Sequence, residues 1–230
     1  MNWLWNNLDE VGELTLVHLA LSVPTIILSF VISVPIGWAA WRYRWSRGVV
    51  LGLCGILYAI PSLPLFIALP GIIGTSVRSP VNVVIVLTLY GIALMVRTAA
   101  DGFGDVDPDI RLSASAVGYS PLGRFWSVDL PLAGPTLLAG LRVVIVSTVS
   151  LVTVSAVLGI ESLGSLFTDG FQRNIPVEIA TGIVMTVVLA LLLDLVAVIL
   201  GRMLMPWTTA DPRARRRARR QIRDPEGAVA

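Results

Sequence analysis

The chain has 230 residues, of which 55% are hydrophobic and 14% are charged, and its mean hydropathy is +0.81. These values exclude an ordinary soluble globular domain and predict an integral membrane protein. All 17 basic residues are Arg, which excludes a P-loop nucleotide site because that site needs Lys, and the single cysteine, Cys54, excludes a disulfide framework and a Cys-based metal site.

The chain begins with a polar segment, residues 1–13, that carries three acidic residues and no basic residue. This charge is the opposite of that in a cleaved signal peptide. A first span follows from about Leu14 to Trp41, which exceeds the ~20 residues needed to cross a bilayer. Pro24 and Pro35 indicate that this span is kinked or tilted. His18 has no carboxylate or Cys nearby in the sequence, so we expect a packed polar residue rather than a ligand.

A short basic loop, residues 42–47, leads to a second span from about Val49 to Ile73. Pro61 and Pro64 interrupt its helical pattern, and irregular backbone persists at membrane depth only where protein or a water-filled cavity satisfies the freed groups. The break, including Ser62, is therefore a candidate lining of a translocation path. A kink that only improves helix packing explains the same residues.

A third span, from about Val81 to Thr98, and a fourth, from about Val143 to Gly159, lie on either side of a polar stretch. Ser147, Ser150 and Thr153 recur at every third residue of the fourth span, so they lie along one side of a helix. Such a stripe either faces a translocation path or hydrogen-bonds neighbouring helices. Its spacing is compatible with both interpretations.

A polar connection, residues 161–176, leads to a fifth span from about Val177 to Met203. Asp194 lies inside this span, and an acid within a membrane marks a candidate functional position. Because only eight residues separate it from Arg202, we expect a role in an ion pair or an interface rather than in a proton relay. The tail, residues 204–230, contains seven Arg and is expected to bind anionic lipid rather than nucleic acid.

The distribution of charge orients the five spans. The basic loop, the polar stretch between the third and fourth spans, and the Arg-rich tail fall on one side of the membrane. The acidic N-terminus and the 161–176 connection fall on the other. Because basic residues accumulate on the cytoplasmic side, we predict a multi-pass protein of the inner (cytoplasmic) membrane, with its N-terminus outside and its C-terminus inside.

The polar stretch between the third and fourth spans, residues 106–130, is here named the elbow because its sequence predicts two short helices. Asp107 can cap a first helix from about Pro108 to Val117, and Pro108 fits the position that needs no N–H group. Gly118 suits the left-handed conformation that closes a helix. We therefore expect a positive φ angle at Gly118.

The second half of the elbow repeats this pattern. Ser120 followed by Pro121 predicts a second capped helix that extends to about Val128, and Leu130-Pro131 is expected to end it. A compact pair of helices can enter a groove of another protein. An ordinary cytoplasmic loop has the same capping residues, so both interpretations are open on this pattern alone.

The elbow resembles the "EAA" loop of ABC importer permeases, in which Glu-Ala-Ala, three residues and Gly precede a stretch ending in Leu-Pro. Here eleven residues separate Gly118 from Leu130-Pro131, as in that loop. The Glu position falls on Leu112, and the two Ala positions fall on Ser113 and Ala114, so two of the three signature letters differ. Without the acid, the ion pair or cap that the family's Glu would make cannot form.

Three further motifs resemble the osmoprotectant subgroup of these permeases, which carries glycine betaine, carnitine or choline. They are Ile60-Pro61-Ser62-Leu63-Pro64-Leu65, Val106-Asp107-Pro108, and Leu163-Gly164-Ser165-Leu166 with Gly170. The resemblance covers residues 14 to 203, so it includes every predicted span.

The resemblance implies an all-α permease domain, residues 14–203, with about five transmembrane helices and a cytoplasmic coupling elbow. It implies no catalytic residue, metal or cofactor in this chain. ATP and Mg²⁺ would be held by partner ATPase subunits, beside a second permease subunit (the same or a different chain) and an extracytoplasmic solute-binding protein. The elbow residues that this resemblance assigns to ATPase coupling are Asp107, Pro108, Leu112, Ser113, Ala114, Val117, Gly118, Tyr119, Ser120, Pro121, Leu130 and Pro131.

The resemblance also implies transport of a compatible solute such as glycine betaine, choline, carnitine or proline. Selectivity for quaternary ammonium groups generally lies in aromatic cages of the binding protein, so this chain leaves the solute open. An ABC permease for an amino acid such as methionine is one alternative. A stand-alone channel or secondary carrier, coupled through Asp194 and His18, is another.

Overall fold

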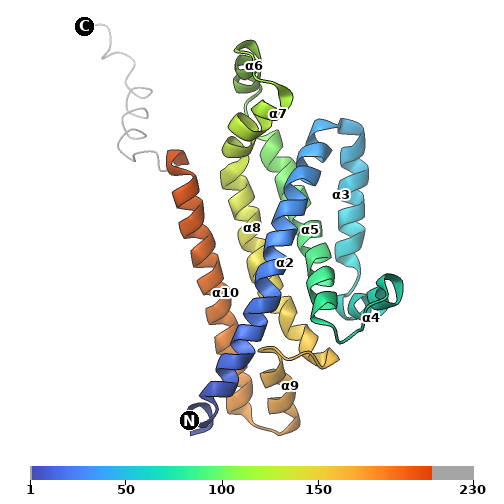
Figure 1. Ribbon diagram of the computed structural model, residues 1–230, viewed down its shortest axis with the longest axis vertical. Coiled ribbons are helices and arrows are strands. Elements are labelled where there is room, and N and C mark those ends of the chain that lie inside the picture. Colours follow the sequence, from blue (N-terminus) through green and yellow to red (C-terminus); the bar gives the residue numbers. More distant parts are fainter. Residues whose placement is uncertain (1, 209–230) are drawn as a thin grey trace, which may run out of the picture.

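The computed structural model describes residues 2–208 as an elongated bundle of helices (Figure 1). The long helices are α2 (Leu8–Arg42), α3 (Arg44–Ala59), α5 (Pro80–Gly104), α8 (Leu130–Val152) and α10 (Pro176–Leu204). The shorter ones are α1 (Asn2–Asn6), α4 (Ser62–Ile73), α6 (Pro108–Ala116), α7 (Pro121–Arg124) and α9 (Ser165–Gln172). A π-helical turn (Phe125–Asp129) precedes α8, and 3-10 turns follow α8 (Thr153–Leu158) and α10 (Pro206–Thr208). The predictions for the Arg-rich tail from residue 209 onward lie outside the described residues.

The all-α, multi-span prediction is confirmed. Within residues 2–208, four helices are long and apolar enough to cross a membrane, and there are five if the bent pair α3–α4 counts as one crossing. α2 begins at Leu8, before the predicted first span, and it continues through Pro24 and Pro35. α5 continues six residues beyond the predicted Thr98, whereas α10 differs from the predicted fifth span by one residue at each end.

The second span is not the single segment predicted from Val49 to Ile73. α3 and α4 meet at an angle of 107°, and the break falls at Ile60 and Pro61. A proline restricts the residue before it to extended backbone, and Ile60 has φ −68° and ψ 127°. The hydroxyl of Tyr90 on α5 donates a hydrogen bond to the carbonyl oxygen of Ile60. The prolines therefore break the helix where predicted, and the freed carbonyl group has a partner.

The prediction that Leu130-Pro131 ends the second elbow helix is wrong. α7, the π turn and α8 belong to one helical segment of 38 residues, Pro121–Leu158, so the fourth span begins well before the predicted Val143. A proline inside an α-helix removes one hydrogen bond, and here a π turn, a form that occurs as single-turn bulges within α-helices, immediately precedes Leu130-Pro131 without ending the helix. The segment ends at Gly159, as predicted, with a φ of 75°.

α2 and α5 form the central pair of the bundle and approach closely at two glycines. A Cβ atom at Gly37 would lie 2.4 Å from the Cβ of Ala99, and one at Gly91 would lie 2.0 Å from the Oγ of Ser29. Small residues allow such close packing in membranes, where no hydrophobic effect drives one helix against another.

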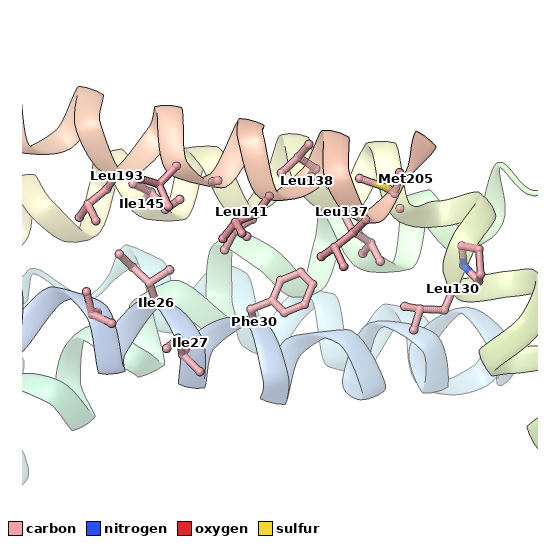
Figure 2. A pocket seen from close by; sticks show the side chains of 18 of the residues that line it. Ile26, Ile27, Phe30, Leu130, Leu137, Leu138, Leu141, Ile145, Leu193 and Met205 are labelled. Carbon is pink, nitrogen blue, oxygen red and sulfur yellow. The ribbon is translucent and has the colours of Figure 1, made fainter. Parts of the chain in front are cut away.

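α10 lies at the edge of the bundle and packs against α8 and α9. Only 17% of its most apolar stretch is buried, so most of its surface faces outward. A groove of about 570 Å³ lies between α10 and α2, and residues of α8 also line it. Figure 2 shows the side chains around the groove, including Phe30, Leu141 and Leu193. This apolar lining suits contact with the hydrocarbon of a bilayer.

The two ends of the bundle carry different elements (Figure 1). The turn between α2 and α3, the elbow helices α6 and α7, and the C-terminal end of α10 lie at one end, whereas α1 and α9 lie at the other. This arrangement agrees with an odd number of crossings between the N-terminus and the end of α10. The predicted orientation makes the elbow end cytoplasmic.

Reporter fusions test this orientation. We predict that a reporter fused after Ala230 is cytoplasmic and that one inserted at Thr168 in α9 is extracytoplasmic, because α10 crosses the membrane between them. Paired alkaline phosphatase and fluorescent-protein fusions measure the side of each position. Placement of both reporters on one side would contradict the five-crossing topology.

A single methyl group tests the close contact between α2 and α5. Gly91→Ala is expected to lower the midpoint of thermal unfolding in detergent, since overpacking of this kind typically costs about 1–3 kcal/mol. Gly52→Ala is the matched control because a Cβ atom at this α3 position meets nothing within 4 Å, and Ala favours a helix over Gly by up to ~1 kcal/mol. Equal loss of stability in both variants would contradict the contact.

Candidate functional site

The first arm of the elbow, α6, begins with the predicted cap. The Asp107 carboxylate accepts a hydrogen bond from the Asp109 N–H group at 2.8 Å, and Pro108 occupies the first turn. Within the arm, the Ser113 hydroxyl donates to the Asp109 carbonyl oxygen at 2.8 Å. The start of the helix is therefore fixed by residues only a few positions apart in the sequence.

The arm ends at Gly118, whose φ of 101° confirms the predicted positive angle. The Gly118 N–H donates to the Ser115 carbonyl oxygen, and the Tyr119 N–H donates to the Ala114 carbonyl oxygen, both at 3.1 Å. This pair of hydrogen bonds is the Schellman arrangement that ends many helices. A side chain at Gly118 would meet no atom within 4 Å, so backbone conformation alone favours glycine here.

The second arm begins at Ser120, as predicted. Its hydroxyl accepts a hydrogen bond from the Gly123 N–H group at 3.1 Å. α7 is a single turn and passes through the π turn into α8. The second arm of the elbow is therefore the extended end of a membrane-spanning helix.

The side chain of Arg111 joins the elbow to the membrane helices. Its Nε donates to Oδ1 of Asp129 at 2.7 Å, and its Nη1 donates to the Val106 carbonyl oxygen at 3.0 Å. Its Nη2 donates to the carbonyl oxygen of Phe103, one of the last four carbonyl groups of α5, which lack partners within that helix. The guanidinium carbon lies 4.0 Å from the ring centre of Trp41 in α2, which is cation–π geometry. Arg111 thus contacts α2, the end of α5 and the start of α8.

Asp129, at the end of the π turn, is the buried carboxylate of this site, with 1% of its surface exposed. Arg124 on α7 is a second cation beside it, with its Nε 3.5 Å from Oδ2. The Nη1 of Arg124 also donates to the Ser115 hydroxyl on α6 at 3.0 Å. Because a buried carboxylate needs paired charges and hydrogen bonds, Asp129 holds both arms in one geometry.

Aromatic rings lie beneath these ion pairs. Phe125 in the π turn packs edge-on against Trp38 of α2, with ring centres 5.3 Å apart, and lies 5.8 Å from the ring of Phe103 in α5. Such pairs contribute about 0.5–1.5 kcal/mol beyond the burial of their area. The base of the elbow is therefore continuous with the apolar core of the bundle.

The elbow carries exposed apolar side chains on both arms, here named the elbow tip: Leu112, Val117 and Leu122, which are 67%, 80% and 68% exposed. Ala114, on the inner side of α6, is buried. Exposed apolar patches are typical of contacts with another protein, so these side chains are candidates for such a contact.

The predicted path residues fall into two groups. At the bend between α3 and α4, Pro61 and Pro64 are exposed and Ser62 is partly buried. On α8, Ser150 is exposed and Ser147 is partly buried. Thr153, which opens the following 3-10 turn, donates to the Ser150 carbonyl oxygen at 2.6 Å. Among the described residues no hydrogen bond joins the two groups.

The two polar residues expected inside spans have separate partners. Asp194 forms an ion pair with Arg142 of α8, with its Oδ1 2.6 Å from Nε, which confirms the predicted pairing. His18 is fully buried with its Nε2 3.0 Å from the Val149 carbonyl oxygen, which confirms a packed polar residue. Their contacts on α8 are seven residues apart, or about 10 Å along the helix, so they do not form one site.

Sequence analysis did not single out Arg111, Asp129 or Arg142. Each is a charge beside apolar sequence: Arg111 follows the cap by four residues, Asp129 precedes Leu130-Pro131, and Arg142 precedes the predicted fourth span. Charges in such places usually have partners. The partners come from other helices, which is why the sequence did not identify them.

Comparison with known families identifies the chain. Residues 29–210 match the family described as "Binding-protein-dependent transport system inner membrane component". The chain belongs to this family. It is therefore a multi-pass transport subunit of the inner membrane, and the resemblance seen in the elbow is confirmed.

Two relatives of this permease match it over most of their own length. It is 26% identical over 206 residues to the choline transport system permease protein OpuBB of Bacillus subtilis (strain 168), which covers 90% of this chain and 94% of the relative. It is 28% identical over 197 residues to the osmoprotectant import permease protein OsmW of Salmonella typhimurium, covering 84% and 91%. A solved inward-facing conformation of the MetNI methionine ABC transporter has a TM-score of 0.73 at 20% identity and covers 84% of this chain and 95% of that chain, which shows a shared fold.

Removal of one partner of the buried pair tests the anchor. Arg111→Ala should lower the stability of the purified permease by about 1.5–3 kcal/mol, because it removes the charged hydrogen bond to the buried Asp129 carboxylate and leaves Arg124, 3.5 Å away, as its remaining cation. Arg47→Ala is the control, since the Arg47–Asp101 pair at the same end is about half exposed and such pairs contribute ~0–1 kcal/mol. Thermal unfolding in detergent measures both. A similar small effect from the two variants would show that Arg111 is not an anchor.

Proposed function

We propose that this chain is the transmembrane permease subunit of an ATP-driven importer that moves a compatible solute of the glycine betaine, choline, carnitine or proline type into the cytoplasm. Family membership supports the transport role, and the two bacterial relatives, permeases for choline transport and osmoprotectant import, support the solute class. The elbow is the observation that carries the coupling to ATP. Its base is fixed by buried charges, and its tip exposes apolar side chains.

We assign the elbow tip to a groove of a cytoplasmic ATPase subunit. A short helix with exposed apolar residues is suited to a helix-in-groove contact, and burial of one Leu side chain contributes about 1.5–3 kcal/mol. Leu112 stands where the related signature has Glu. At this position an apolar contact therefore replaces a charged one.

Closure of the ATPase subunits on ATP would displace α6, and the buried Arg111–Asp129 pair would pass that displacement to α8. Because α8 is continuous with the second arm of the elbow, no loop lies between Leu122 on that arm and the membrane. The helices would then rock between outward-facing and inward-facing arrangements.

The proposed assembly contains two permease subunits, two ATPase subunits that hold ATP and Mg²⁺, and an extracytoplasmic solute-binding protein. About five crossings are too few to enclose a wide path, which favours a pair of permeases. The elbow end is assigned to the cytoplasm and the N-terminus to the outside, in agreement with the charge distribution.

The alternatives predict different partners or solutes. An importer for an amino acid such as methionine is supported only by the shared fold with the methionine transporter. Uptake assays with labelled methionine and labelled glycine betaine distinguish an amino-acid importer from a compatible-solute importer. A stand-alone carrier coupled through Asp194 and His18 is less favoured, because these residues have separate partners. Copurification of a P-loop ATPase with the tagged permease decides between an importer and a carrier.

The elbow contact is tested at Leu112. Leu112→Asp should reduce copurification of the ATPase and solute uptake more than Leu112→Ala does, because it places a charge in an apolar contact. Phe171→Asp is the control: Phe171 is 79% exposed on α9, at the opposite end of the molecule (Figure 1), and its change should leave ATPase association intact. If Leu112→Asp changes neither association nor uptake, Leu112 is not a contact.

The glycine between the two arms is tested by Gly118→Val. A positive φ strains a β-branched residue by about 1 kcal/mol or more, so this variant should insert normally but lose solute uptake while ATP hydrolysis continues. Gly118→Asn is the milder comparison, since Asn tolerates positive φ better. Normal uptake by the Val variant would exclude Gly118 as a coupling element.

A further inference from the structure

The ion pair between α8 and α10 lies deep within the membrane-spanning part of the bundle. Nε and Nη2 of Arg142 donate to Oδ1 and Oδ2 of Asp194 at 2.6 and 2.8 Å. Arg142 lies 12 residues into α8, and Asp194 lies ten residues before the end of α10. At 1.5 Å per residue, Arg142 is about 18 Å from the start of α8 and Asp194 about 15 Å from the end of α10, so both lie within helices long enough to cross a hydrocarbon layer of about 30 Å.

This pair is not sealed within the protein. The Arg142 side chain is 49% exposed and that of Asp194 is 18% exposed. Arg has five N–H donors, and the two used by Asp194 leave three without an acceptor among the described residues. Unsatisfied donors in hydrocarbon cost several kcal/mol each. The open side of Arg142 therefore requires water or polar groups.

The surface around Arg142 differs from the outer face of α10. On α8 an exposed stripe follows the helical repeat and contains both a charge and a hydroxyl group: Leu132, Pro135, Ala139, Arg142, Val146 and Ser150. On α10 every exposed residue from 183 to 200 is Val, Ile or Leu. The α10 face suits lipid, whereas the α8 stripe suits an aqueous path.

We propose that Arg142, oriented by Asp194, is a carboxylate-binding residue on the translocation path, where the carboxylate of a zwitterionic solute docks on the open donors of the guanidinium group. The proposal rests on the proposed function and adds the substrate chemistry of the path. Asp194 occupies one edge of the guanidinium and leaves the rest free, so a second carboxylate can bind in the same plane.

The same pairing limits how tightly the solute is held. Asp194 neutralises the charge of Arg142, so a passing carboxylate meets hydrogen-bond donors without a full net positive charge. Transport requires binding that is favourable enough for entry and weak enough for release. A solute with an alcohol in place of the carboxylate, such as choline, gains little from this site.

The first experiment tests whether the α8 stripe is accessible to water. In a Cys54→Ala background, Val146→Cys and Val187→Cys place one thiol on each face, and the native residues are 49% and 52% exposed. The probe is a methanethiosulfonate reagent with a permanent trimethylammonium charge, applied to the assembled transporter in proteoliposomes. We expect modification at position 146 but not at position 187. Failure to label position 146, or labelling of position 187 to at least the same extent, would overturn the proposal.

The second experiment asks whether Arg142 recognises the carboxylate. Arg142→Lys keeps the charge but not the planar donors, and Arg142→Gln combined with Asp194→Asn removes both charges without leaving one unpaired. Uptake of glycine betaine and carnitine should fall about tenfold in both variants, the size expected from a lost charged hydrogen bond. Choline uptake and ATP hydrolysis by the same complexes should change by less than about twofold.

The outcomes separate this proposal from the proposed function. An equal fall for all three solutes, or a parallel loss of ATP hydrolysis, would make the pair structural and overturn the proposal. If the wild-type complex takes up choline but neither glycine betaine nor carnitine, the proposal is also overturned, while the assignment as an importer stands. If the wild-type complex transports none of the three solutes and binds no ATPase, the proposed function fails, and thiol labelling alone decides whether the stripe is wet.

Discussion

The buried contact between Arg111 and Asp129 sets the geometry on which the elbow depends. Removal of two charges from water costs several kcal/mol for each ion, and a well-packed apolar pair can be as stable. The charged pair adds directional hydrogen bonds, which an apolar pair cannot form. The guanidinium donates to the carboxylate at the start of α8, to Val106 and to the end of α5, and it also covers the ring of Trp41. One side chain thereby fixes α6 relative to three membrane helices, and the tip can expose its apolar residues without losing its position.

The bilayer imposes a second constraint, because backbone groups freed inside it need partners from the protein. The chain meets this requirement differently at each irregularity. At Pro61 the helix turns sharply, and Tyr90 supplies a donor to the freed carbonyl group. At Pro131 a π turn immediately precedes the proline, and the helix continues past it. Gly37 and Gly91 lie within regular helix, and there the missing side chains let α2 and α5 approach closely. Irregular sequence in this protein therefore corresponds to specific contacts between helices.

The sequence predicted what depends on neighbouring residues. Composition and run length gave the spans, and capping residues gave α6 and the positive φ at Gly118, because these features are local. It failed where a distant partner decides the outcome. The residues around Pro131 do not indicate that a π turn precedes it and that the helix continues. The residues around Arg111 and Arg142 do not indicate that their partners are aspartates 18 and 52 residues further along the chain. The base of the elbow and the ion pair at membrane depth therefore required the structure.

The continuity of the second elbow arm with α8 has a mechanical consequence. α8 packs closely on α5 at Gly140, where a Cβ atom would lie 2.7 Å from Cγ2 of Thr98. From that contact to Pro121 is about 28 Å along the helix, and to Leu158 about 27 Å, at 1.5 Å per residue. The contact at Gly140 therefore lies near the middle of this continuous helical segment. If this helix tilts as one body about that contact, a displacement of its elbow end moves its far end in the opposite direction, so one continuous helix can link movements at the two ends of the bundle.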